Sequence, residues 1–362
     1  MDSGQQALLR LHLTPGLGRT ALFRLYHHFG GFTAAAGATG RQLAAAGLSD
    51  SVINAFQTLS TTDYQQALNR LEELGGRLIS YWDKEYPDPL RKIHDPPALL
   101  YVRGKLPQKE CFAIVGSRQA TTAGLQLTRE IAVNLAERDI CIVSGLARGI
   151  DSAAHRGALD CGGATIAVLG CGIDRIYPPE NARLFHDLIR NNAVISEYPP
   201  GTPPSAGHFP GRNRIISGLS RGVLIVEAAE NSGSLITGDF ALEQGRELFA
   251  IPGAVHQPNS RGTNRLIKEG AQLVTSADDI LSLLWPTSLP RTTQKKQESF
   301  AGQLTEPSLS VYRQLGAEPR HIDEICRKCD LTPMEVSAIL LDLELRGGVQ
   351  MLPGNTYIRG NI

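Results

Sequence analysis

The sequence has no excess charge of either sign. It contains 36 lysines and arginines against 36 aspartates and glutamates, so its formal net charge is zero. This balance disfavours a wholly basic nucleic-acid binder but is compatible with a local basic patch. No apolar run reaches the roughly 20 residues of a membrane-spanning helix, and Met1 leads into a polar stretch rather than a signal peptide. We therefore expect a cytoplasmic protein without membrane contacts.

Cysteine and the common cofactor motifs are also scarce. The six cysteines are scattered along the chain, which indicates reduced thiols rather than a disulfide framework. Cys326 and Cys329 have no second pair nearby, and no His-x-x-x-His occurs, so we expect no metal site. No turn matches G-x-G-x-x-G or the Walker loop, so we expect no dinucleotide or ATP cofactor.

One stretch, His208 to Gly253, combines the features of an anion-binding surface. Three arginines, Arg212, Arg214 and Arg221, lie within ten residues, and residues 204–221 contain no acid. Arginines that lack paired acids and lie beside glycine turns favour an anionic ligand. A strand-like run follows, and then a small-residue turn at 231–234 opens a helical run whose first N–H groups could bind phosphate. The sequence predicts a site for a phosphate-rich ligand here.

Phe209 directly precedes these arginines. It lies in the proline-flanked segment 207–211, which has neither helical nor strand periodicity, so we expect a loop. A ring in such a loop can stack on an unpaired base, a contact worth about 1–3 kcal/mol. Because duplex DNA hides its base faces, this interpretation favours a single strand. The alternative is that Phe209 is a core ring.

Residues 77–286 alternate strand and helix patterns. Each strand candidate is a short and nearly continuous apolar run, as expected when both faces of a strand are buried. The pattern predicts a doubly wound α/β domain with a mostly parallel sheet, preceded by a proline-dotted lead-in that adds one edge strand. The strand candidates are 111–115, 140–143, 165–169, 193–196, 223–226, 248–251 and 272–274.

A smaller helical domain, residues 1–76, precedes this domain. Two helices joined by Thr14-Pro-Gly-Leu-Gly18 resemble a helix-hairpin-helix unit, in which the glycine turn approaches a DNA phosphate. The alternative is that the glycines only close a tight connection between helices. The first 60 residues contain four arginines and no lysine, so the composition does not decide between the two.

A third domain is expected at residues 305–362, after a polar linker at 287–304. Three helices followed by a β-hairpin are the pattern of a winged helix. Its third helix carries Glu335, Asp342 and Glu344 against only Arg346. This acidic helix is poorly suited to reading DNA, so a protein contact is at least as well supported.

Four turns of the central domain follow strands. Because the carboxyl ends of parallel strands meet at one sheet edge, these turns should form a connected anion-binding surface. For the acids near these strand ends a structural role is favoured, and Asp151 is predicted to cap the helix that follows it. The turns are Gly116–Arg118, Ser144–Asp151, Gly170–Gly172 with Tyr177–Asn181, and Asn231–Ser234.

As an ordered set, these motifs resemble the DNA-processing protein A (DprA, also Smf) family over about residues 77–285. The resemblance implies an extended Rossmann-like domain that binds single-stranded DNA without strong sequence preference, and no catalysis. It also implies a homodimer that loads the RecA recombinase in natural transformation, with single-strand-binding protein as a further partner. The motifs are Gly116-Ser-Arg118, Ser144–Asp151 with Ala154-His155, Ala167–Gly170 through Tyr177–Asn181, Ile195–Pro199, Phe209–Ser217, Ser232–Ser234, and Gly262–Asn264 with Glu269–Ala271.

The same resemblance assigns roles to residues. Ser117 and Arg118 would hold a phosphate, Phe209 would contact a base, and the last part of the Rossmann-like domain would form the dimer interface. Some relatives carry a lysine shortly before the phenylalanine, and residues 203–207 contain none. The predicted DNA-binding residues are Gly116, Ser117, Arg118, Gly145, Arg148, Gly149, Phe209, Arg212, Asn213, Arg214, Arg221, Ser232, Gly233 and Ser234, and the predicted dimer residues are Leu266, Ile267 and Leu273.

Two other functions remain open from the sequence. The first is a Rossmann-type nucleotide phosphoribohydrolase, in which residues 231–237 would be the characteristic turn and Glu243 would have to be the glutamate that acts after it. The linker and the winged helix would have no use in such an enzyme. The second is a duplex-DNA regulator that acts through the winged helix, and the acidic third helix argues against it.

Overall fold

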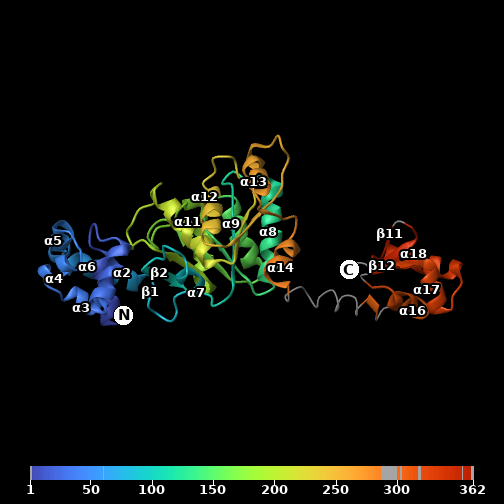
Figure 1. Cartoon of the computed structure of the whole chain (residues 1–362), viewed down its shortest axis with the longest axis horizontal. Coiled ribbons are helices and arrows are strands. Elements are labelled where there is room, and N and C mark those ends of the chain that lie inside the picture. The colour runs from blue at the N-terminus through green and yellow to red at the C-terminus, as the bar shows by residue number, and fades with distance from the viewer. Residues whose placement is uncertain are drawn as a thin grey trace. The chain divides into compact units, whose positions relative to one another are not determined.

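The computed structural model describes residues 2–59, 61–286, 300–301, 304–316, 319–352 and 354–359 (Figure 1). The contacts divide the chain into two compact units, Met1–Pro286 and Thr287–Ile362. Each unit is described by itself. Most of the predicted linker, 287–299 and 302–303, lies outside the described residues.

The first unit is built on a nine-stranded sheet with the strand order β1-β2-β6-β5-β4-β3-β7-β8-β9. All pairs from β6 to β9 are parallel, and β1 and β2 add an antiparallel edge. The predicted doubly wound, mostly parallel sheet is confirmed, and β1 is an edge strand that the sequence did not predict. The strands are β1 (Gly76–Ser80), β2 (Leu99–Gly104), β3 (Cys111–Val115), β4 (Cys141–Ser144), β5 (Thr165–Leu169), β6 (Ala193–Ser196), β7 (Gly222–Ile225), β8 (Glu247–Ala250) and β9 (Gln272–Leu273).

Helices cover both faces of this sheet, which is why its strands are continuously apolar. In β3, Phe112 and Ile114 pack into the layer of α8 and α9, whereas Ala113 and Val115 pack into the layer of α11 and α12. The order reverses between β3 and β7, which creates a crevice at their carboxyl ends. The helices are α7 (Asp88–Arg91), α8 (Thr122–Ala136), α9 (Ile150–Asp160), α10 (Ala182–Asn191), α11 (His208–Leu219), α12 (Leu235–Glu243), α13 (Pro258–Lys268) and α14 (Ala277–Leu284), with the 3-10 turn η1 (Pro179–Asn181).

Six helices precede the sheet, and they do not enclose a core of their own. Their buried leucines form one cluster with Leu78, Leu99 and Tyr101 of the edge strands. The predicted turn between the first two helices is present, and Gly16 has a φ of 79° in it, a backbone conformation that favours glycine. The helices are α1 (Ser3–His12), α2 (Arg19–Phe29), α3 (Phe32–Ala36), α4 (Gly40–Ala45), α5 (Asp50–Thr58) and α6 (Thr61–Glu73).

The second unit is a winged helix, as predicted. Its three-stranded sheet has the order β10-β12-β11, and β10 was not predicted from the sequence. Cys326 packs in the core of this unit, so this cysteine has a structural role. The elements are α16 (Ser308–Gln314), β10 (Arg320–His321), α17 (Ile322–Cys329), α18 (Pro333–Leu345), β11 (Val349–Leu352) and β12 (Thr356–Arg359). In the described part of the chain, no helix combines the length and the apolar character needed to cross a bilayer.

Candidate nucleic-acid interface

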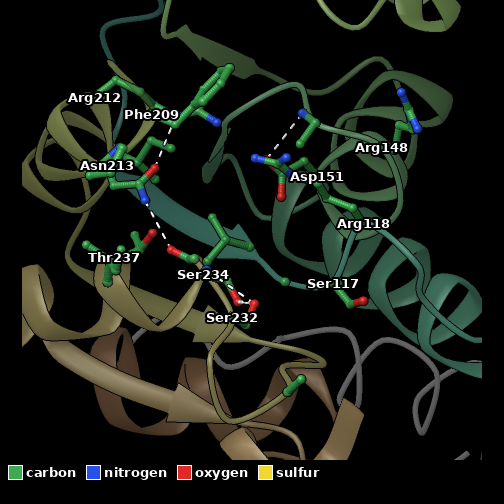
Figure 2. A pocket seen from close by; sticks show the side chains of 18 of the residues that line it. Ser117, Arg118, Arg148, Asp151, Phe209, Arg212, Asn213, Ser232, Ser234 and Thr237 are labelled. Atoms are coloured by element: carbon green, nitrogen blue, oxygen red, sulfur yellow. Dashed lines mark hydrogen bonds between the residues drawn. The ribbon is translucent and has the colours of Figure 1, made fainter. Parts of the chain in front are cut away.

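A cleft of about 890 Å³ lies at the carboxyl ends of β3 and β7, where the strand order reverses. The turns after β3 and β4, the start of α11 and the turn before α12 all contribute to it. Figure 2 shows Phe209, Arg212 and Asn213 on one side, Arg118, Arg148 and Asp151 on the other, and Ser232 and Ser234 below them. The structure therefore brings most of the predicted site residues together. A smaller pocket of about 90 Å³ adjoins it between Arg118, Tyr177 and Phe209.

Phe209 lies in the first turn of α11, so the predicted loop is wrong. Pro210 is tolerated there because the first N–H groups of a helix have no partner within the helix. The Phe209 ring stacks on Tyr177, with ring centroids 5.6 Å apart and 28° between the planes. A Cβ added at Gly170 would lie 2.9 Å from the Phe209 ring, so glycine at this position lets the ring rest on the end of β5. The ring is half-buried and borders the cleft.

Tyr177 was part of a predicted turn, but it was not predicted as a binding residue. It borders both pockets and is 37% exposed, so it offers a second aromatic surface beside Phe209. Its position after β5, in the Tyr-Pro-Pro motif, was the available signal. Only the fold shows that it contacts Phe209.

Arg118 is exposed and lies over the Phe209 ring. Its guanidinium carbon lies 5.5 Å from the Phe209 ring centroid. Among the described residues, Arg118 takes part in no ion pair, whereas Arg148 lies 3.4 Å from Glu180. Arg118 is therefore the cleft arginine that is most available to an incoming anion. Beside it, the Ser117 hydroxyl accepts a hydrogen bond from the Gln119 N–H at 3.1 Å, which orders this turn.

Arg212 is buried and points into the fold. It donates to the carbonyl oxygen of Gly145 at 2.7 Å and also to that of Val168, so it ties β4 to β5. Burial lowers the pKa of its guanidinium, and the nearby Asp151 carboxylate opposes this effect. Arg212 lines the cleft, but its side chain is buried. It therefore adds positive charge to the wall of the cleft and does not present an exposed guanidinium.

Asp151 does not cap the helix that follows it, which corrects the prediction. Its carboxylate accepts the N–H groups of Gly145 and Ala147, at 3.1 and 3.3 Å. Burial raises its pKa, while Arg212 and these hydrogen bonds act in the opposite direction. The Gly145 N–H is thus occupied by an internal acid. Gly149, with a φ of 71°, lies so close to the β3 turn that an added Cβ would be 2.2 Å from the Ser117 carbonyl oxygen.

The turn before α12 closes the cleft on its lower side. The Asn213 amide donates to the Gly233 carbonyl oxygen at 3.3 Å, which joins α11 to this turn. The Ser232 and Ser234 hydroxyl oxygens are 2.7 Å apart. Gly233 has open space where a Cβ would lie, so a ligand can approach its backbone closely. Gly116, at the end of β3, also lines the cleft.

Arg214 and Arg221 have acidic partners, so the prediction of unpaired arginines is wrong for both. The buried Arg214 donates to both Glu197 oxygens, at 2.8 and 2.9 Å, and lies 3.3 Å from Asp95. Burial alone would lower the pKa of Arg214, but Glu197 and Asp95 raise it. Arg221 precedes β7, at the opposite end of that strand from the cleft, where it lies 3.0 Å from Glu110. Neither residue lines the cleft.

The predicted dimer residues differ in their accessibility. Leu266 is 4% exposed and belongs to the core between α13 and the sheet. Ile267 is partly buried against the same core. Leu273, in the edge strand β9, is 50% exposed. Of the three, Leu273 is the side chain that is free to contact a second copy.

The fold and the cleft define a Rossmann-like α/β domain with a crevice at the carboxyl ends of its strands, followed by a winged helix. The chain belongs to the DNA recombination-mediator protein A family, whose model matches residues 77–285. The DprA winged helix domain matches residues 295–355. The chain is therefore a DNA-processing recombination mediator.

Individual relatives and a solved structure also match the chain. The chain is 41% identical to Protein Smf of Escherichia coli over 312 residues, which cover 84% of this chain and 83% of that protein. It is 48% identical to DNA processing protein DprA of Streptococcus pneumoniae over 206 residues, 56% of this chain and 73% of that protein. A solved structure of the Streptococcus pneumoniae protein matches with a TM-score of 0.69 and 36% identity, over 78% of this chain and 98% of that chain.

A structure of DNA processing protein A from Helicobacter pylori also matches. Its TM-score is 0.53 and its identity 31%, over 59% of this chain and 96% of that chain. That work describes the single-stranded DNA binding mode of the Helicobacter pylori protein.

Proposed function

We propose that this chain binds single-stranded DNA in the cleft between β3 and β7. The observation that carries the proposal is Arg118, an exposed guanidinium without an ion pair in the described part of the chain, standing over the Phe209–Tyr177 ring stack. A nucleotide presents an anion and a flat ring together, and this pair of features matches both. The single-stranded DNA binding mode described for the Helicobacter pylori relative supports the same ligand class.

Each part of the cleft has a role in this proposal. Arg118 and the Ser117 turn take a phosphate, because a guanidinium forms charge-assisted hydrogen bonds with phosphate oxygens. Phe209, with Tyr177 beside it, stacks with an unpaired base. The buried positive charge of Arg212 attracts the phosphates electrostatically. The turn Ser232–Ser234 offers backbone N–H groups to the next nucleotide. Backbone and stacking contacts do not read base edges, so we expect little sequence preference.

The biological role that we propose is to protect incoming single strands and to help load the RecA recombinase in natural transformation. The chain would act in the cytoplasm as a homodimer, with Leu273 on the edge strand β9 at the interface. Single-strand-binding protein would be the coat that RecA has to replace. Membership of a recombination-mediator family supports this role.

The DNA-binding proposal is tested by fluorescence anisotropy with labelled oligo-dT and with a duplex of the same length. Oligo-dT should bind at least about tenfold more tightly, because its bases are free to stack. The affinity should fall with salt, since phosphate contacts release counterions. Equal or tighter binding to the duplex would contradict the proposal.

The loading proposal has its own test. On single strands coated with single-strand-binding protein, the chain should shorten the lag before RecA hydrolyses ATP. A chain that binds oligo-dT but leaves this lag unchanged would be a DNA-binding protein without the loading role.

The hydrolase alternative is less well supported by the geometry. Glu243 is the last residue of α12, so its backbone lies about 12 Å along the helix from Leu235 at the cleft end. Release of ribose 5-phosphate from nucleoside monophosphates, lost in Glu243→Gln, would favour the hydrolase instead.

A further inference from the structure

The third helix of the winged helix, α18, is apolar on two opposite sides. One side carries Val336, Leu340 and Leu343, which are fully buried in the core of this unit. The other side carries Met334 and Leu345, which are 83% and 80% exposed. A helix on the surface of a globular protein normally has one apolar side, which faces the core, and a polar side that faces solvent. The second side of α18 therefore has the character of a contact surface rather than of a solvated face.

The exposed apolar residues of α18 follow a regular spacing. Met334, Ala338, Leu341 and Leu345 are all exposed, and they are separated by four, three and four residues. This is the a/d spacing of a heptad repeat, the pattern that packs one helix along another. At about 100° per residue the four side chains fall within a stripe about 60° wide. We call these four residues the α18 stripe, and its spacing fits a partner helix.

The wing extends the apolar surface at one end of the α18 stripe. Met351 of β11 is 46% exposed, and its N–H donates to the Glu344 carboxylate at 3.1 Å, which holds β11 against the end of α18. β11 is an edge strand of its sheet. A partner helix lying on the stripe could therefore also contact Met351.

The flanks of the α18 stripe are acidic. Glu335 and Asp342 lie on one side and Glu344 on the other, whereas the helix itself, residues 333–345, contains no lysine or arginine. Arg346, just past the helix, pairs with Asp342 at 3.0 Å. Glu335 and Glu344 are therefore the flanking acids that have no ion pair among the described residues. Two copies of this helix would bring like charges together along the seam, and nucleic acid would be repelled. The charges instead complement a partner with basic flanks.

We propose that the α18 stripe is a docking surface for an amphipathic helix of a partner protein, whose apolar stripe is flanked by lysines or arginines. This surface belongs to a different unit of the chain from the proposed DNA cleft. A docking site here would give the mediator a protein contact that DNA binding does not require.

The test uses the full chain and two designed peptides. Both have leucine at the a and d positions of three heptads, one has lysine at e and g, and the other has glutamate there. In an anisotropy titration the lysine peptide should bind saturably, more weakly at high salt, and at least about tenfold more tightly than the glutamate peptide. Leu341→Asn, at a position that is 58% exposed, should weaken binding of the lysine peptide by about tenfold or more.

The matched control is Leu242→Asn on α12, where the side chain is 61% exposed, and it should leave peptide binding unchanged. Three results would overturn the proposal: no saturable binding of the lysine peptide, equal binding of both peptides, or unchanged binding by Leu341→Asn. Two other results would assign the stripe to a different occupant and also overturn it. These are self-association of the chain that Leu341→Asn abolishes, seen by light scattering, and duplex affinity that Leu341→Asn lowers.

Discussion

Among the arginines that were predicted to bind DNA, the presence of an acidic partner decides which can bind an anion. Arg214 is neutralised by Glu197 and Asp95, and Arg221 by Glu110. Arg118 has no ion pair in the part of the chain that the structure describes, and it is exposed beside the Phe209 ring. Because an unpaired and exposed guanidinium loses little on binding an anion, Arg118 should contribute more to DNA affinity than the arginines with acidic partners.

Arg118→Ala should weaken oligo-dT binding tenfold or more, about 1.5–3 kcal/mol for a charge-assisted hydrogen bond to phosphate. It should also reduce the slope of log K against log salt by about 0.7, the value for one phosphate contact on a single strand. Arg221→Ala, which removes an equal charge at the opposite end of β7, serves as the control and should bind like the unmodified chain. Binding of Arg118→Ala at full affinity would remove this residue from the interface.

His155 should make the stability of the first unit depend on pH. It is fully buried on α9, its Nδ1 lies 2.7 Å from the Thr165 hydroxyl oxygen, and burial lowers its pKa to about 3. The unfolded chain therefore takes up a proton near the ordinary pKa of about 6.5, whereas the folded chain does not. The stability that this difference provides is complete above pH 6.5 and is lost as the pH falls towards 3.

Urea unfolding should therefore show a loss of about 2 kcal/mol from this residue between pH 7.5 and pH 5. His155→Gln should reduce this pH dependence, while His256→Gln, at an exposed position, should retain it. If His155→Gln shows the same loss as the unmodified chain, other groups cause it.

At the scale of elements, the contact between the end of β5 and the start of α11 sets the position of the stacking ring. Gly170→Ala would place a methyl group 2.9 Å from the Phe209 ring and displace it. Since only the ring has to move, we expect a decrease in oligo-dT affinity of about 1–3 kcal/mol at most, the value of one stacked base, with little change in thermal stability. Gly316→Ala, where a Cβ meets open space, is the control. A large loss of stability in Gly170→Ala would instead show that the backbone had shifted.

The sequence predicted the elements that local pattern determines. The buried strands, from Cys111–Val115 onward, and the three helices of the winged helix were found because their apolar residues recur with a strand or helix period. The start of α11 was missed because His208-Phe-Pro-Gly211 contains residues that are rare in helices, although the first turn accepts them.

The location of the cleft was predicted from the strand ends. The turns after β3 and β4 lie at the cleft as expected, because parallel strands place their carboxyl ends together. The acidic partners Asp95 and Glu110 could not be inferred, since they are more than a hundred residues away in sequence from Arg214 and Arg221. Glu197 is only 17 residues from Arg214, but no local pattern pairs the two. The role of Asp151 was missed for a different reason. An aspartate at the start of a helix can cap that helix or accept N–H groups from the preceding turn, as Asp151 does from Gly145, and the sequence is the same in both cases.

At the scale of the whole molecule, the proposed DNA contact and the proposed protein contact belong to different units of the chain. The cleft of Met1–Pro286 carries the exposed Arg118 and the two aromatic rings, whereas the winged helix carries the α18 stripe with its acidic flanks. Asp95 has a further part in the first unit, because it contacts both Arg19 at the start of α2 and Arg214 in α11. The N-terminal helices are thereby tied to the helix that holds Phe209.

The cleft is a surface crevice between loops, with Arg118 and Gln119 exposed at its border, and not a tunnel. A polymer can therefore enter it sideways at any internal nucleotide, and no free end has to be threaded. Closed circular single strands should then compete for the chain as well as linear strands of equal length, in a competition assay against labelled oligo-dT. A preference for linear strands would mean that the chain binds the ends of the strand. Without such a preference, the protein can occupy a strand whose two ends are held by other machinery.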